Sequence, residues 1–390
     1  MPSCTRRTFL KSSVLAGTSL LLPGLLGGCA VTPTVPGTVL STPQSWSLER
    51  KLAQMLLIGF PGETLAPGSP IHQTVQVHGV GGVVLFDNNV DQGVTGRNIT
   101  APAQTKALTT ALREAAAVPL FIAVDQEGGL VARLKERSGF PPSLSARYLG
   151  EQNRSELTRS AADSIAATLA EYGFNLNLAP VVDLNLNPDN PVIAFKERSF
   201  SADPAVVTAH AATFIASHRR HRILTCLKHF PGHGSSHHDS HLGLTDVTRS
   251  WSDGELRPYR NLIQRELCDM VMTAHTFNTA IDPDYPATLS KATIDGILRK
   301  RLGFDGVVVS DDLYMGAIMR HYRYETAVEK AINAGVDLLV VANDKAYQPD
   351  IVPRTIELLL KLVETGRIPR ERIDQACRRI MALKQDRVVA

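Results

Sequence analysis

The sequence predicts a single (β/α)8 barrel, and two observations carry this prediction. Eight short apolar runs, continuous rather than alternating, recur along the chain and are separated mostly by segments of helical period. Continuous apolar runs are typical of parallel strands that are covered on both faces. Polar residues also follow seven of the eight runs, and a closed barrel would bring them together at one mouth.

The eight runs are the expected barrel strands, because they are rich in Val, Ile, Leu and Phe and are bounded by Gly, Pro and Asn. A doubly wound open sheet is the competing fold, since periodicity alone does not show closure. The runs span residues 54–60, 81–86, 119–124, 174–182, 223–227, 270–273, 306–309 and 336–341.

Segments of helical period fill the intervals between the runs. In residues 157–169, Leu, Ala, Ile and Leu recur every four positions, which is the stripe by which a helix contacts a core, and Gly173 ends the segment. The other expected helices lie at residues 71–78, 103–116, 206–218, 256–267, 294–302, 327–334, 351–364 and 370–384.

The N-terminal residues read as an export signal. Arg6 and Arg7 precede an apolar segment at residues 14–26, and Cys29 follows two glycines. This pattern resembles a twin-arginine signal joined to a lipoprotein lipobox, in which Cys29 is the lipidated residue. The apolar segment is short for a membrane-spanning helix, which needs about 20 residues.

Three regions are therefore expected: the signal at residues 1–28, a Pro- and Thr-rich tether at residues 29–46, and the barrel at residues 47–390. A tether of this composition cannot bury enough apolar surface to fold. We expect an exported protein that faces the periplasm and is anchored in a membrane through Cys29. Ala30 favours the outer membrane, by resemblance to sorted lipoproteins.

Composition limits the partners. The net charge of +3 is spread thinly, with no basic block beyond the N-terminus, so no nucleic-acid partner is expected. Three cysteines remain in the barrel, Cys226, Cys268 and Cys377, and their odd number and wide spacing give no disulfide framework. We expect buried thiols, a monomer and no cofactor.

Residues 228–241 hold five of the chain's twelve histidines and follow the fifth apolar run. A proline and the glycines Gly232 and Gly234 interrupt regular structure, so we expect a mobile loop at the carboxyl end of a strand. Asp239 and His241 are two residues apart, so in an extended segment the carboxylate can hold the imidazole. A histidine held in this way can donate a proton and later accept one.

Carboxylates follow other runs. Asp311 and Asp312 are neighbours, so we expect one to face the mouth, as a nucleophile, base or metal ligand, and the other to cap the following helix. Asp125 opens the segment Asp-Gln-Glu-Gly-Gly and Arg133 follows it, a combination that can bind a polyhydroxylated ligand.

These motifs resemble glycoside hydrolase family 3, in its β-N-acetylhexosaminidase branch. The resemblance rests on Lys-His-Phe-Pro-Gly-His-Gly at residues 228–234, Asp-Ser-His at 239–241, Asp-Gln-Glu-Gly-Gly at 125–129 and Ser-Asp-Asp-Leu at 310–313. It extends from about residue 48 to residue 384.

The resemblance implies a retaining, exo-acting enzyme that removes terminal β-linked N-acetylglucosamine from peptidoglycan fragments or chitooligosaccharides. Asp311 would be the nucleophile, and His241, oriented by Asp239, the acid and base. The chain departs from the family pattern at Leu130, where Arg often follows the glycine pair, and in a longer segment before Arg198. The residues implied to hold the sugar are Asp125, Arg133, Arg198, Lys228 and His229.

Three alternatives stay open. A metal-dependent hydrolase could use His229, His233, His238 and Asp239, although barrel metal sites usually draw ligands from several strands. A β-glucosidase-like activity of the same family is the second alternative. A non-catalytic, wall-binding lipoprotein is the third. Without a metal, we expect the other histidines of the stretch, His233, His237 and His238, to pack in the loop or to face solvent.

Overall fold

The computed structural model describes residues 45–89, 94–344 and 346–388. One parallel sheet organises the described residues, and neighbouring strands in it follow the order of the chain. Its eight strands are β1 (Leu56–Gly59), β2 (Gly82–Val84), β5 (Phe121–Val124), β6 (Leu176–Asn177), β7 (Leu224–Phe230), β9 (Met270–Thr273), β11 (Val307–Ser310) and β12 (Leu339–Val341).

The sheet closes between its first and last strands. β12 pairs with β1 in parallel register, and a parallel bridge joins Val309 to Leu338. On the other side of β12, toward β11, the Leu338 N–H donates to Val308 O at 3.0 Å, and the Ser310 N–H donates to Leu338 O at 2.9 Å. An open sheet would leave such edge groups unpaired. The predicted barrel is therefore confirmed, and the doubly wound alternative is wrong.

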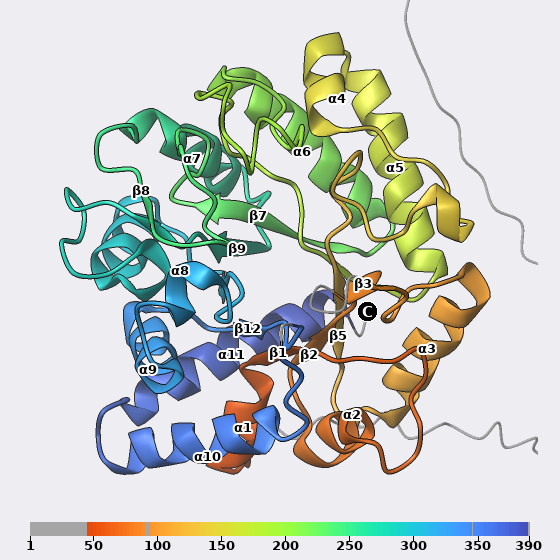
Figure 1. Ribbon diagram of the computed structural model, residues 1–390, viewed down its shortest axis with the longest axis vertical. Helices are drawn as coiled ribbons and strands as arrows, with labels where there is room; N and C mark the ends of the chain where they lie inside the picture. Colours follow the sequence, from red (N-terminus) through yellow and green to blue (C-terminus); the bar gives the residue numbers. More distant parts are fainter. Residues whose placement is uncertain (1–44, 90–93, 345, 389–390) are drawn as a thin grey trace, which may run out of the picture. The chain divides into compact units, whose positions relative to one another are not determined.

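Helices surround the strands, and α10 and α11 pack beside α1 (Figure 1). The α-helices are α1 (Leu48–Gln54), α2 (Pro70–Gln73), α3 (Pro102–Ala115), α4 (Ala146–Gln152), α5 (Ser155–Glu171), α6 (Pro204–Arg220), α7 (Arg257–Gln264), α8 (Gly316–Met319), α9 (Tyr324–Ala334), α10 (Ile351–Glu364) and α11 (Arg370–Arg387). The remaining helical turns are η2 (Thr74–His78), η3 (Glu136–Ser138), η4 (Asp253–Leu256), η5 (Ala287–Leu289) and η6 (Ala292–Arg301).

Two small strand pairs lie outside the barrel sheet. β3 (Asn88–Asn89) pairs antiparallel with β4 (Val94–Thr95) in the segment after β2. β8 (Thr245–Asp246) pairs parallel with β10 (Thr276–Phe277), and so links the segments that follow β7 and β9. Both pairs follow the carboxyl ends of barrel strands, where they shape the loops around the mouth.

Most observed strands are shorter than the predicted runs, and two of the differences affect the site. The run at residues 174–182 forms only the short β6, because Pro180 has no N–H to continue the ladder, although Val181 returns to a bridge with Lys228. The run at 223–227 is too short, since β7 continues to Phe230 and pairs there with Thr273 of β9. Lys228 and His229 therefore lie at the end of this strand, before the loop begins.

The amino-terminal end of the barrel contains a buried lysine. Lys384 of α11 is fully buried and donates to Gln54 Oε1 and to Gly81 O, both at 2.7 Å. Its Nζ atom also lies 4.7 Å from the centre of the Phe121 ring. Gln54 and Gly81 precede β1 and β2, so α11 covers the end of the barrel opposite the mouth.

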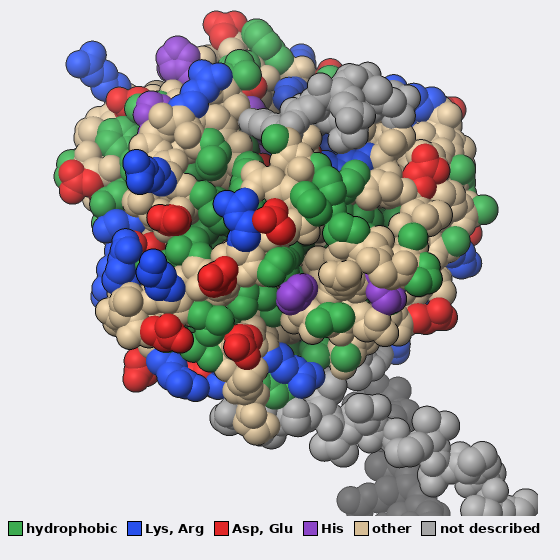
Figure 2. Space-filling view, turned by 60° about the horizontal axis from the view of Figure 1, so that its bottom comes forward, with side chains coloured by type: hydrophobic (Ala, Val, Ile, Leu, Met, Phe, Trp, Pro, Cys, Tyr) green, Lys and Arg blue, Asp and Glu red, His purple; other side chains and the backbone are tan. Residues whose placement is uncertain are grey.

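Residues 1–28, Cys29 and most of the predicted tether lie outside the described residues. Within residues 45–89, 94–344 and 346–388, no helix has the length and apolar character needed to cross a membrane. Cys226, Cys268 and Cys377 are free thiols. On one face of the molecule, Lys and Arg side chains are interspersed with Asp and Glu side chains (Figure 2).

Candidate active site

A pocket of about 430 Å³ opens at the carboxyl ends of the barrel strands. Charged side chains from the segments after β2, β5, β6, β7, β11 and β12 line it. A larger hollow of about 770 Å³ lies before β9 and β11, at the opposite ends of these strands. Ligands of such barrels bind at the carboxyl ends, so the smaller pocket is the candidate site.

The pocket gathers the residues that the sequence singled out. Those that line it are Asp125, Arg133, Arg198, Lys228, His229, His241 and Asp311. Asp239 contacts His241 directly. Leu130, the departure from the family pattern, also lines the pocket and is 64% exposed.

Asp311 follows β11 directly. Its Oδ1 atom accepts the N–H of Asp312 at 2.8 Å. Burial would raise the pKa of Asp311, but nearby histidines, His275 first, and the N–H of Asp312 outweigh burial and hold the pKa below its ordinary value. The carboxylate is therefore charged near neutral pH, as a nucleophile must be.

Asp312 does not cap a helix, so that expectation is wrong. Its Oδ1 atom accepts the N–H of Tyr314 at 3.2 Å and the N–H of Ala342 at 2.9 Å, which ties the loop after β11 to the end of β12. α8 begins after Met315 without a side-chain cap. Because β11 ends at Ser310, strand alternation stops before the two carboxylates, and both line the pocket. Burial raises the pKa of Asp312 to about 7.

Asp239 holds His241 through one oxygen atom. Oδ1 accepts the His241 N–H at 2.9 Å and lies 2.7 Å from Nδ1 of the same residue. These hydrogen bonds hold the pKa of Asp239 well below its ordinary value. With Nδ1 bound to a carboxylate, Nε2 is the ring nitrogen left to exchange a proton with a ligand.

A buried ion network forms the floor of the pocket. Lys228 in β7 lies 2.6 Å from Asp125 and 2.7 Å from Glu127. Arg198 donates Nε and Nη2 to the two oxygens of Glu127, at 2.8 and 2.7 Å. Burial would raise the pKa of Glu127, but Arg198 and Lys228 hold it well below its ordinary value. Glu127 was not among the predicted site residues, although it stands two positions after Asp125 in the same motif.

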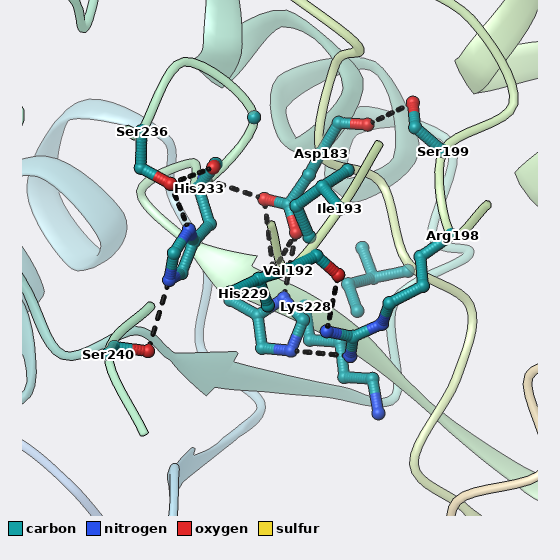
Figure 3. A network of polar contacts seen from close by, with 12 residues as sticks. Asp183, Val192, Ile193, Arg198, Ser199, Lys228, His229, His233, Ser236 and Ser240 are labelled. Carbon is teal, nitrogen blue, oxygen red and sulfur yellow. Dashed lines mark hydrogen bonds and ion pairs between the residues drawn. The ribbon is translucent and has the colours of Figure 1, made fainter. Parts of the chain in front are cut away.

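His229 is held by Asp183, a second residue missing from the predicted site (Figure 3). Its Nδ1 atom lies 2.7 Å from Asp183 Oδ2, and its Nε2 atom lies 3.0 Å from Arg198 Nη2. Arginine can only donate, so Nε2 accepts and Nδ1 carries the proton. Burial, aided by Arg198 and Lys228, lowers the pKa of His229 well below its ordinary value, so the ring is neutral.

The other histidines of the stretch behave as expected. His233 is buried, and its two ring nitrogens lie 2.7 Å from Ser236 Oγ and 3.1 Å from Ser240 Oγ (Figure 3). His237 and His238 are exposed. No three His, Cys, Asp or Glu residues among those described are grouped so that they could hold a metal ion. The ligand set of the metal-dependent alternative is therefore not assembled.

The base of the histidine-rich segment is packed tightly, contrary to the expected mobility at its glycines. A Cβ atom on Gly234 would lie 1.7 Å from Leu184 O, and a Cβ atom on Gly232 would lie 2.6 Å from Glu255 Oε2. Glycine is needed at these two positions for close approach of the backbone.

The fold and the pocket define a (β/α)8 enzyme with a charged, ligand-sized cavity at its mouth. The chain belongs to the glycosyl hydrolases of family 3. Residues 47–383 match the family model described as "Glycosyl hydrolase family 3 N terminal domain".

Three similar proteins illustrate the relationship. The chain is 33% identical over 344 residues to "Beta-hexosaminidase A" of Pseudoalteromonas piscicida, covering 82% of this chain and 55% of the relative. It is 36% identical over 270 residues to "Beta-hexosaminidase" of Tolumonas auensis, covering 68% of this chain and 77% of that protein. A solved family 3 beta-N-acetylglucosaminidase from Paenibacillus superposes with a TM-score of 0.79 at 37% identity, covering 88% of this chain and 63% of its own.

Proposed function

We propose that the protein is a retaining β-N-acetylhexosaminidase that removes terminal β-linked N-acetylglucosamine from an oligosaccharide. The observation that carries this proposal is the presence, in one pocket, of the charged Asp311 and of His241 held by Asp239. The names of the similar hexosaminidases support the proposal.

In the proposed first step, Asp311 attacks the anomeric carbon while the bond from that carbon to the leaving oxygen breaks. The imidazolium of His241 gives its Nε2 proton to the departing oxygen. Asp239 accepts a hydrogen bond from Nδ1–H of the ring before and after this transfer. In the second step, water attacks the glycosyl ester. His241 takes a proton from that water, and the Asp311 carboxylate leaves.

The floor of the pocket would hold the sugar. Asp125 and Arg133 follow β5, and their closest approach is 3.7 Å, so each retains hydrogen-bonding capacity for hydroxyl groups. Arg198 and Lys228 are fixed by Glu127 and give the pocket rigid donors. His229 orients Arg198 through Nε2, so its proposed role in holding the sugar is indirect.

The test of this proposal is hydrolysis of 4-nitrophenyl N-acetyl-β-glucosaminide by the wild type and by Asp311→Ala. We expect the variant to lose about 10⁴–10⁶-fold in kcat, as enzymes do when a nucleophile is removed. Asp305→Ala is the matched control, because the Asp305 side chain is 87% exposed and precedes β11, at the end of that strand opposite the pocket. Undiminished turnover by Asp311→Ala would refute the assignment.

The natural substrate is either a peptidoglycan fragment or a chitooligosaccharide. Incubation with purified muropeptides and, separately, with chitobiose, followed by analysis of released N-acetylglucosamine, distinguishes the two. Turnover of aryl glucosides in preference to N-acetylglucosaminides would instead favour the β-glucosidase-like alternative.

Lipidation belongs to the same proposal, because the sequence pattern at residues 6–29 supports it. We propose that Cys29 carries the lipid and that the barrel faces the periplasm from the outer membrane. Metabolic labelling with a radioactive fatty acid should mark the wild type and leave Cys29→Ser unlabelled. Density separation of the membranes then locates the labelled protein, and recovery in the inner membrane contradicts the sorting.

A further inference from the structure

The pair Asp239 and His241 lies on a loop between β7 and β8, here called the histidine loop (residues 231–244). Carboxylates fix the first half of this loop to the barrel. Asp183 Oδ1 accepts the N–H of His233 at 2.8 Å, and Glu255 Oε2 accepts the N–H of Gly234 at 3.1 Å. The base of the loop is thus buried and bonded before the chain reaches the catalytic pair.

The second half of the histidine loop is tied to a different barrel segment, α8. The N–H of Ala317 donates to Ser240 O at 3.1 Å, and the N–H of Gly316 donates to His241 O at 3.2 Å. The first N–H groups of a helix have no partner within the helix, and α8 has no side-chain cap. The carbonyls of the histidine loop therefore provide partners at the start of α8.

Gly316 permits this contact because it has no side chain. A Cβ atom there would lie 2.7 Å from His241 O, 2.9 Å from Leu242 C and 3.0 Å from Leu242 O. All three atoms belong to the backbone of the histidine loop, so a methyl group at position 316 could fit only if the loop moved. Gly243, within the same loop, has nothing within 4 Å of a Cβ atom.

We propose that Gly316 is a positioning residue for the reaction, because it sets where His241 lies relative to Asp311. Asp311 precedes Gly316 by five residues on the segment after β11, and Gly316 then contacts the backbone carbonyl of His241. The nucleophile and the proton donor come from different barrel segments, and this contact fixes the position of one relative to the other. The inference rests on the proposed glycosidase function.

A displacement of His241 relative to Asp311 should change the dependence of the rate on the leaving group. A poor leaving group must be protonated as it departs, whereas a good one, such as a dinitrophenolate, departs without help. The second step needs His241 as a base when water attacks, but azide attacks the glycosyl enzyme without losing a proton. A displaced His241 therefore slows the cleavage of substrates with poor leaving groups most. For substrates with good leaving groups, azide restores turnover in the second step.

The experiment compares Gly316→Ala with Gly243→Ala, using aryl N-acetyl-β-glucosaminides of graded leaving-group acidity, with and without azide. For Gly316→Ala we expect about a 10²-fold loss of kcat with poor leaving groups, the cost of a misplacement near 1 Å. We expect a smaller loss with good leaving groups, azide rescue with formation of glycosyl azide, and little change in inhibition by N-acetylglucosamine. Gly243→Ala should match the wild type throughout.

Two results overturn the inference while the function stands: wild-type kinetics in Gly316→Ala, or a loss that is equal for every leaving group and unaffected by azide. If Gly316→Ala does not fold, Ala317→Pro decides, because proline has no N–H to donate to Ser240 O and is tolerated in the first turn of a helix. This second variant should show the same dependence on the leaving group. If that dependence is absent, the inference is overturned. Failure of the wild type to cleave any N-acetyl-β-glucosaminide would instead refute the proposed function.

Discussion

Asp239 uses a single oxygen to accept both the backbone N–H and the ring Nδ1–H of His241, at 2.9 and 2.7 Å. The carboxylate thus fixes the tautomer of the ring as well as its direction. Such an arrangement makes the histidine depend on a neighbour that does not itself react. His241 lies seven residues after Gly234, which stands at the hydrogen-bonded base of the same loop.

The first prediction concerns this pair. Asp239→Asn should lower kcat/KM about 10²–10⁴-fold, because the amide cannot stabilise the imidazolium and can present an N–H to Nδ1. Steady-state kinetics with an aryl N-acetyl-β-glucosaminide measure the loss. His238→Ala is the control, since His238 is the exposed neighbour of Asp239. Equal activity of the two variants would contradict the role of Asp239.

The second prediction concerns the buried network of Glu127. Glu127→Gln should destabilise the fold by about 3–5 kcal/mol, because Arg198 and Lys228 would lose the charge that compensates them in a buried place. Urea denaturation measures the free energy of unfolding. Glu151→Gln breaks the exposed ion pair with Arg147 and should change it by less than about 1 kcal/mol. A similar loss in the free energy of unfolding in both variants would show that Glu127 does not stabilise the fold by compensating Arg198 and Lys228.

The third prediction is a pH dependence of stability at Lys384. Burial lowers the pKa of Lys384 to about 7 in the folded protein, from 10.5 for a solvated lysine. Between these values the unfolded chain holds a proton that the folded chain lacks, so stability from this group rises with pH across that window and is lost as pH falls toward 7.

Lys384→Met should remove this rise. The free energy of unfolding of the wild type, relative to the variant, should increase by up to about 1.4 kcal/mol per pH unit between pH 7 and 10. Denaturant unfolding at several pH values gives the comparison, in which the titration of other groups cancels. A constant difference across the window would show that Lys384 remains protonated in the fold.

The fourth prediction is stereochemical. If Asp311 forms a covalent intermediate, the first product released is β-N-acetylglucosamine, because two displacements at the anomeric carbon retain its configuration. Proton NMR in the first minutes of hydrolysis, before mutarotation, reports the anomer. Initial release of the α anomer would mean that a carboxylate activates water directly, and the nucleophile would have to be reassigned.

The eight strands and their parallel arrangement could be predicted from apolar continuity, and Asp125, Lys228 and Asp311 from their position at the end of a strand, because these are local signals. Arg198 and His229 were predicted only through the resemblance to the family. Asp183 and Gly316 could not be identified as positioning residues in this way. Their roles arise from contacts between segments far apart in the chain, Asp183 with His229 and Gly316 with the loop carbonyl of His241. The helix cap expected at Asp312 was wrong for the same reason, since its second partner, Ala342, follows another strand.

Lys228 and His229 lie within β7, whereas His241 lies on the loop that follows it. Under the proposed function, the residues that hold the sugar and the residue that transfers the proton therefore lie on different elements, a strand and a loop. Under the proposed function, a single cut by a protease at the exposed residue His237 would break the chain between them, leaving a barrel that still binds the sugar without cleaving it. Such a nicked protein would act as a competitive decoy, protecting the polymer that the intact enzyme consumes.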